Sequence, residues 1–202
     1  CGPAEFLTLI ENAENIIMEH PDSALILLRK IDRSSLSSGK ERADFSLLYS
    51  MALDKCYIDT TDDGVINVAV NYYKKHKPLN KRFMSLYYQA RVYENAKDDE
   101  KAMQSISEAS SIREEAVDTS YRIKALYVKA RIYMRLFQFE LQNETYEKIS
   151  ELTYASKSWG DYIQCSLDRA NVNIILHNYL HNNITNIIIH ITIIIFFIFF
   201  NN

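Results

Sequence analysis

ARVYENAKDDEKAM, residues Ala90 to Met103, opens with a quartet that nearly recurs as ARIY at Ala130 to Tyr133. The two quartets begin 40 residues apart, and the same step leads on to Ala170. Apolar residues keep the register in all three places, as Val92, Ile132 and Val172. Recurrence at a fixed period predicts a chain made of repeated structural units.

The residues around the first quartet have a packing role. Ala90, Ala102 and Ala109 are small, and Tyr93 and Ile106 lie between them along the chain. Small side chains let two helices approach closely, and larger side chains beside them fill the remaining space. We therefore expect these five residues where the two helices of one hairpin cross.

The composition predicts a chain of helices. Only four Gly and three Pro occur in 202 residues, and no alternating β pattern precedes the C-terminal segment. Apolar residues at helical spacing predict helices over residues 3–19, from Pro21, and over 41–57, 63–76, 82–96, 98–112, 119–137, 141–156 and 160–175. Short polar connections favour antiparallel neighbours. The predicted fold over residues 3–175 is all-α, a right-handed α–α superhelix of about four helical hairpins.

Charge and motif content exclude several classes of function. Lys and Arg total 23 against 26 for Asp and Glu, a net charge of −3, so no basic surface is expected for nucleic acid. No Gly-rich phosphate loop, HExxH or GxSxG motif occurs. Acidic doublets at residues 62–63 and 98–99 predict helix caps rather than metal ligands, and His177 and His181 lack an acidic or Cys neighbour. We expect a non-enzymatic protein without a cofactor or metal.

The cysteines have two different roles in this interpretation. Cys56 and Cys165 lie in helical patterns and are expected to behave as small buried apolar residues. Cys1 followed by Gly2 is what remains after signal peptidase trims a bacterial lipoprotein. Residues 1–2 therefore predict lipidation of Cys1 and a membrane-anchored lipoprotein of the bacterial cell envelope that faces the periplasm. The alternative is a fragment that starts at Cys1 by chance.

Residues 176–202 form an apolar tail. The 33 residues after Arg169 contain no Asp, Glu, Lys or Arg, and residues 184–200 contain nine Ile and four Phe. Seventeen helical residues extend about 25 Å, slightly less than a hydrocarbon core of about 30 Å. Two interpretations stay open. The tail is either a truncated membrane helix or an out-of-frame reading of AT-rich DNA.

The packing residues resemble the tetratricopeptide repeat, a helix–turn–helix unit. The residues that match its motif are Ala90, Tyr93, Ala102, Ile106 and Ala109. The unit headed by Ala130 keeps Tyr133 and Tyr146 but has Gln142 where the motif has Ala, and its period of 40 exceeds the usual value of about 34. Residues 10–112 look like the tetratricopeptide-repeat proteins of Bacteroidetes, which are often envelope lipoproteins or sensor halves of regulators. The resemblance implies an interaction module and no catalytic residues.

The resemblance also implies a concave face, lined by the first helix of each hairpin, where peptides or partner helices dock. Judged by the motif, the residues that project into this groove are Tyr87, Arg91, Glu94, Asn95, Tyr127, Arg131, Met134 and Arg135. Tyr and Arg are the residue types that dominate binding hot spots. The alternative is that these residues form solvated helix faces.

Three functional hypotheses follow. The first is a non-catalytic scaffold of the cell envelope that binds a protein or peptide and reaches the membrane through lipidated Cys1 and, in one interpretation, the tail. The second is the sensor half of a membrane-linked signalling or transcriptional regulator whose output domain is missing from this sequence. The third, an enzyme accessory or cryptic hydrolase, ranks below both, and the fold alone does not choose among them.

Overall fold

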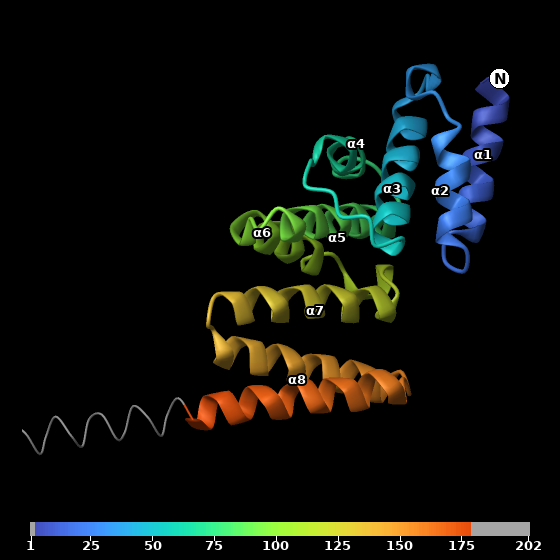
Figure 1. Ribbon diagram of the computed structural model, residues 1–202. Coiled ribbons are helices and arrows are strands. Elements are labelled where there is room, and N and C mark those ends of the chain that lie inside the picture. Colours follow the sequence, from blue (N-terminus) through green and yellow to red (C-terminus); the bar gives the residue numbers. More distant parts are fainter. Residues whose placement is uncertain (1–2, 179–202) are drawn as a thin grey trace, which may run out of the picture. The chain divides into compact units, whose positions relative to one another are not determined.

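The computed structural model describes residues 3–178, with side chains from Glu5 onward. All regular structure in this part of the chain is helical, and residues 3–178 contain no strand (Figure 1). The predicted all-α class is therefore confirmed. The chain divides into two compact units, Cys1–Ile132 and Tyr133–Asn202.

The helices follow one another with short connections. Their bounds are α1 (Pro3–Ile16), α2 (Pro21–Arg29), the 3₁₀ turn η1 (Arg33–Ser35), α3 (Gly39–Lys55), α4 (Gly64–Tyr73), α5 (Leu79–Asn95), α6 (Asp99–Ser110), η2 (Glu114–Ala116), α7 (Thr119–Arg135) and α8 (Phe139–Ala155). Residues 159–178 are also helical. The predicted boundaries agree with these bounds to within three residues, because each helix stops where its apolar periodicity meets a polar break.

Local chemistry explains where several helices begin. Pro21 opens α2 at a position where its missing N–H leaves no intrahelical bond unmade. Ser38 and Glu41 form a reciprocal capping box at the start of α3. The Asp98 carboxylate accepts the backbone N–H of Lys101 at 3.1 Å and caps α6, as the acidic doublet predicts.

The 40-residue period is visible in the backbone. The helices α3, α5 and α7 each contain 17 residues and begin at Gly39, Leu79 and Thr119, exactly one period apart in the chain. Each is followed two residues after its end by a residue with positive φ: Tyr57 at 57°, Lys97 at 61° and Phe137 at 56°. Whole helices and the turns that end them therefore recur at the 40-residue period of the sequence.

The predicted packing residues lie inside the first unit. Ala90, Ala102, Ile106 and Ala109 are all 0% exposed, and Tyr93 packs against the same buried cluster. The next copy keeps Ala130 at 0%. The third copy departs from the pattern, because Ala170 is exposed although Val172 is buried. The close helix crossing predicted from small residues is therefore found between α5 and α6.

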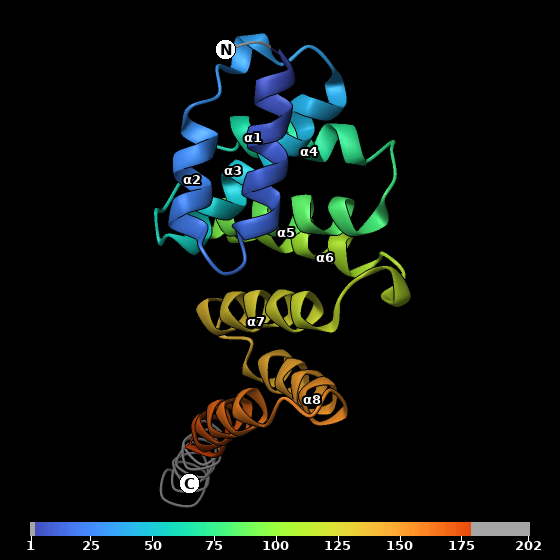
Figure 2. The ribbon, with the colours of Figure 1, turned by 90° about the vertical axis from the view of Figure 1, so that its right-hand side faces the viewer.

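In the first unit, α1 and α2 lie on one side of α3, and α4 lies on the other (Figures 1 and 2). The helices α5 and α6 form a hairpin that runs across the direction of α3 (Figure 1). One cluster of buried side chains extends along the chain from Phe6 to Ile132 and includes Tyr121 and Val128 of α7. This cluster is the hydrophobic core that holds the first unit together.

Candidate functional site

The arginines of the two quartets converge on one carboxylate. Arg131 binds Glu94 with two nitrogens, Nε to Oε1 at 3.0 Å and Nη2 to Oε2 at 2.8 Å. Arg91 reaches the same carboxylate from one turn earlier on α5, with Nη1 2.6 Å from Oε2. The Nε of Arg91 donates to Asp54 Oδ1 of α3 at 2.9 Å. We call Asp54, Arg91, Glu94 and Arg131 the ion-pair ladder.

The residues of the ion-pair ladder recur with the 40-residue period. Asp54 and Glu94 occupy equivalent positions 40 residues apart, and so do Arg91 and Arg131. Each arginine therefore pairs with the acid of the preceding repeat. One period further, the equivalent residues are Met134 and Asn171, which cannot form an ion pair. The ladder ties α3, α5 and α7 together within the first unit.

Burial and charge act in opposite directions on these groups. Burial of Glu94 raises its pKa, but the hydrogen bonds and positive charges of Arg131 and Arg91 outweigh this effect, so the pKa lies below its usual value. Burial lowers the pKa of Arg91, and Asp54 and Glu94 raise it by more. Glu94 is therefore ionised at neutral pH and its charge is compensated inside the protein.

Two of the residues expected in the groove are buried. Tyr87 is 7% exposed and its ring lies edge-on to Tyr88 and Tyr121, with centroids 4.9 and 6.1 Å away. Burial raises the pKa of the Tyr87 hydroxyl. Glu94 is 4% exposed. Both side chains contact the protein interior, where packing and ion pairing account for them.

The remaining groove residues are more accessible. Arg131 keeps 40% of its side chain exposed, whereas Asn95 and Tyr127 are half-buried. Asn95 Nδ2 lies 3.4 Å from the backbone oxygen of Thr60. Met134 is 47% exposed and Arg135 is half-buried, and both belong to the second unit. Arg131 and Met134 thus offer the most surface to a partner.

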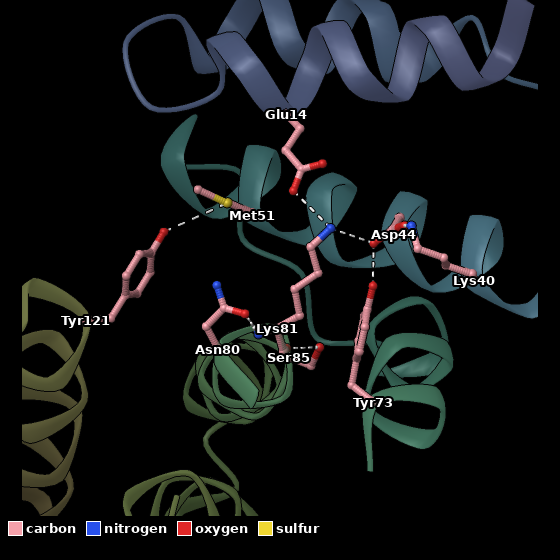
Figure 3. A network of polar contacts seen from close by, with 9 residues as sticks. All are labelled: Glu14, Lys40, Asp44, Met51, Tyr73, Asn80, Lys81, Ser85 and Tyr121. Atoms are coloured by element: carbon pink, nitrogen blue, oxygen red, sulfur yellow. Dashed lines mark hydrogen bonds and ion pairs between the residues drawn. The ribbon is translucent and has the colours of Figure 1, made fainter. Parts of the chain in front are cut away.

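Sequence reasoning missed a second polar network, which joins four helices (Figure 3). Lys81 of α5 lies between Asp44 of α3, at 2.7 Å, and Glu14 of α1, at 2.9 Å. Tyr73 of α4 donates its hydroxyl to the Asp44 carboxylate, and Lys40 binds the other oxygen at 2.6 Å. The available signal was Asp44 itself, a charged residue inside an apolar helical stripe.

This network keeps Asp44 ionised. Burial raises the pKa of Asp44, but hydrogen bonds from Lys40, Lys81 and Tyr73 lower it by more, so the net shift is downward. Burial lowers the pKa of Lys81, and the hydrogen bonds to Asp44 and Glu14 raise it by more. The network is a charged joint between α1, α3, α4 and α5.

The acidic doublet at residues 62–63 behaves differently from the one that caps α6. Asp62 accepts the backbone N–H of Gly64 at 2.8 Å, but Asp63 makes no side-chain cap although it directly precedes α4. Asp63 instead accepts the hydroxyl of Tyr93 at 2.7 Å. Burial and this hydrogen bond raise the pKa of Tyr93 to about 12. The expectation that both acids cap a helix is wrong for Asp63, whose carboxylate is engaged by the Tyr93 hydroxyl instead.

Of the two internal cysteines, Cys165 is buried as predicted and Cys56 is only half-buried. Cys165 is fully buried, with Sγ 3.2 Å from the backbone oxygen of Tyr146, and burial raises its pKa to about 11. Cys56 is a half-buried free thiol that packs against the core. The predicted lipidation at Cys1 and the apolar stretch 184–200 lie outside the described residues.

Residues 3–178 hold no cluster of three or more His, Cys, Asp or Glu side chains that could bind a metal ion. Within the same residues, no helix combines the length and the apolar content that crossing a bilayer requires. Comparison of the chain with protein-family models, curated proteins and solved structures gave no match.

Proposed function

We propose that this protein is a non-catalytic helical-repeat scaffold that binds a protein or peptide partner. The observation that carries the proposal is the recurrence of α3, α5 and α7 at a period of 40 residues. Equivalent residues on repeated helices create a surface that extends from one repeat to the next, and such surfaces usually bind extended partners. In this proposal the hairpins form a right-handed superhelix of the tetratricopeptide type.

The proposed partner surface centres on the accessible residues of α7. Arg131 and Met134 are one helical turn apart and supply a forked cation and a flexible apolar side chain. Both types are enriched in protein interfaces. Tyr127 precedes Arg131 by four residues, which places it on the same helix face. Within the first unit, Tyr87, Arg91 and Glu94 support this helix from inside.

Exposed aromatic residues of the second unit support a role in protein binding. The rings of Tyr154, Trp159 and Tyr162 contact one another, with centroids between 5.6 and 6.3 Å apart. Tyr154 is 61% exposed and Trp159 is 52% exposed. Clustered accessible aromatics are characteristic of binding sites, because they offer large, rigid contact areas.

Photo-crosslinking in cells of the source organism tests the partner surface. We expect p-benzoylphenylalanine at Met134 to capture a discrete protein adduct, and the same group at Lys148, an exposed residue of α8, to capture none. With the crosslinking group at Tyr127 instead, an added Met134→Glu substitution should weaken the adduct, since it removes the apolar contact and leaves the ion-pair ladder intact. Identical adducts from the Met134 and Lys148 positions, or no adduct from either, would contradict the proposed surface.

We also propose that lipidated Cys1 holds the scaffold on the bacterial cell envelope, facing the periplasm. The support is the resemblance of residues 10–112 to tetratricopeptide-repeat proteins that are often envelope lipoproteins, which are anchored through an acylated cysteine. Mass spectrometry of the N-terminal peptide from the native organism should show acyl groups on the thiol and the amine. A free, unmodified Cys1 would contradict the envelope assignment and leave the partner surface untouched.

A further inference from the structure

The first unit contains a pocket that the proposed partner surface does not use. It has a volume of about 320 Å³ and lies among η1, α3 and the start of α4. Its apolar lining comes from Leu36, Phe45, Val65 and Val68. This volume is near the lower end for small-molecule sites, at about 300 Å³, and fits a ligand about the size of one amino acid.

Two arginines line the pocket without an acidic partner. Arg33 lies over the rings of Phe45 and Tyr49, with its guanidinium carbon 5.4 and 4.9 Å from the centroids. Its guanidinium group forms no ion pair or hydrogen bond with residues 3–178. The contact with the two rings holds the guanidinium group at the pocket and leaves its N–H donors available to a ligand.

Arg42 is oriented by the backbone. Its Nη1 donates to the carbonyl oxygens of Leu36 and Ser37, both at 3.0 Å. Within residues 3–178 its Nε and Nη2 have no acceptor. Arg91 and Arg131 of the ladder, by contrast, are both bound to carboxylates. The pocket lining therefore combines two guanidinium groups that bind no carboxylate of residues 3–178 with apolar side chains.

The charge balance of the pocket selects the ligand. Asp62 is the acidic residue in the lining, and one of its oxygens already accepts the Gly64 N–H. Two positive charges against one negative charge leave an excess of one, which suits a monoanion better than a phosphate dianion. Guanidinium groups match the planar fork of a carboxylate. The apolar lining requires a hydrocarbon group next to that carboxylate.

We propose that the η1–α3–α4 pocket binds a small apolar carboxylate, with Arg33 and Arg42 holding the carboxylate and Phe45, Val65 and Val68 enclosing the hydrocarbon group. This chemistry occurs in a free apolar amino acid and in the C-terminal residue of a peptide. The site is separate from the proposed partner surface on α7, so either proposal can fail without the other.

Titration calorimetry of the full chain with N-acetyl-leucine tests the pocket. We expect a Kd of about 1 mM or lower, and amide chemical shifts of Gly64 and Val65 should move on binding. N-acetyl-leucinamide, which lacks the carboxylate, and acetate, which lacks the hydrocarbon group, should each bind at least about tenfold more weakly. Leucine compared with Gly-Gly-Leu then distinguishes a free amino acid from a peptide terminus.

Two variants and a control make the test specific. Arg33→Gln should weaken the binding of N-acetyl-leucine about tenfold, because it removes one of the two charges proposed to hold the carboxylate. Val68→Phe should abolish binding by filling the pocket from an exposed helix face. Arg113→Gln removes an equally exposed charge at η2 and should change nothing. Equal binding of the amide, equal loss in Arg113→Gln, or no binding at about 10 mM would overturn the proposal.

Discussion

The carboxylate of Glu94 is almost inaccessible to solvent, and its charge is balanced by Arg131 and Arg91. Removing one partner of a buried ion pair leaves an uncompensated charge, which costs more than the pair contributes. The arginines of the recurring quartets are thus explained by stability. Their position in a groove-facing motif does not by itself make them contacts for a partner.

We predict that Glu94→Gln lowers the free energy of unfolding by about 2 kcal/mol. The amide cannot balance two guanidinium groups, although Arg91 keeps its bond to Asp54. Urea denaturation followed by circular dichroism measures the change. Glu100→Gln, an exposed acid of α6, is the control and should stay within about 0.5 kcal/mol of the wild type. Equal stability of the two variants would show that the ladder contributes little.

Four helices end in the same type of turn. After α3, α5, α7 and α8 the chain places Tyr57, Lys97, Phe137 and Lys157 at positive φ, near 57°. After α5, the backbone N–H of Lys97 donates to the backbone carbonyl of Glu94, and the backbone N–H of Asp98 donates to that of Tyr93. These are the two hydrogen bonds of a Schellman motif. Glycine is the usual residue at this position, because a side chain is strained there.

Lys97→Gly should therefore stabilise the protein by about 0.5–1 kcal/mol, since it relieves the left-handed strain of a residue with a Cβ. Lys97→Ala is the matched control. It removes the same charge and keeps the strain, so no comparable gain is expected. Thermal unfolding of the two variants beside the wild type measures the difference. A gain in Lys97→Ala as large as in Lys97→Gly would assign the effect to charge.

The joint around Asp44 predicts a pH dependence. Its pKa is lowered in the folded state, so it contributes stability above its ordinary value of 3.8, and this contribution is lost as the pH falls through the folded-state pKa. Urea denaturation from about pH 7 to about pH 3 measures the free energy of unfolding of the wild type and of Asp44→Asn. The difference between these two free energies should become smaller as the pH falls. The control Asp59→Asn changes an exposed carboxylate, and its free energy of unfolding should equal that of the wild type at every pH. A constant difference for Asp44→Asn would rule out this linkage.

At the level of the whole chain, the first unit has a core of its own. The buried cluster from Phe6 to Ile132 connects all the helices from α1 to α7. We predict that a fragment of residues 1–138, which keeps the turn after α7, folds cooperatively without the rest of the chain. Far-ultraviolet circular dichroism and a single urea transition would demonstrate this. A fragment that lacks helical signal or unfolds without a cooperative transition would show that residues 139–202 are required.

The sequence by itself determined the helices, their order and the 40-residue period. Helical spacing of apolar residues is a local property, and Ala90, Ala102 and Ala109 could be assigned to a close crossing because small residues are rarely placed at such intervals for another reason. The same reasoning correctly predicted the burial of Ala130 in the second copy. It failed for Ala170, which is exposed, because the burial of a residue depends on what packs over it.

Only the tertiary structure decided which charges meet. Arg131 binds an acid 37 residues earlier in the chain, and Lys81 joins Asp44 to Glu14, because the crossing of helices brings these groups together. The pocket beside Arg33 arises in the same way from η1, α3 and α4. The helices could be predicted from the sequence, because an α-helix has 3.6 residues per turn and apolar residues at this spacing lie on one face. Contacts between helices depend on crossing geometry, which no local period encodes.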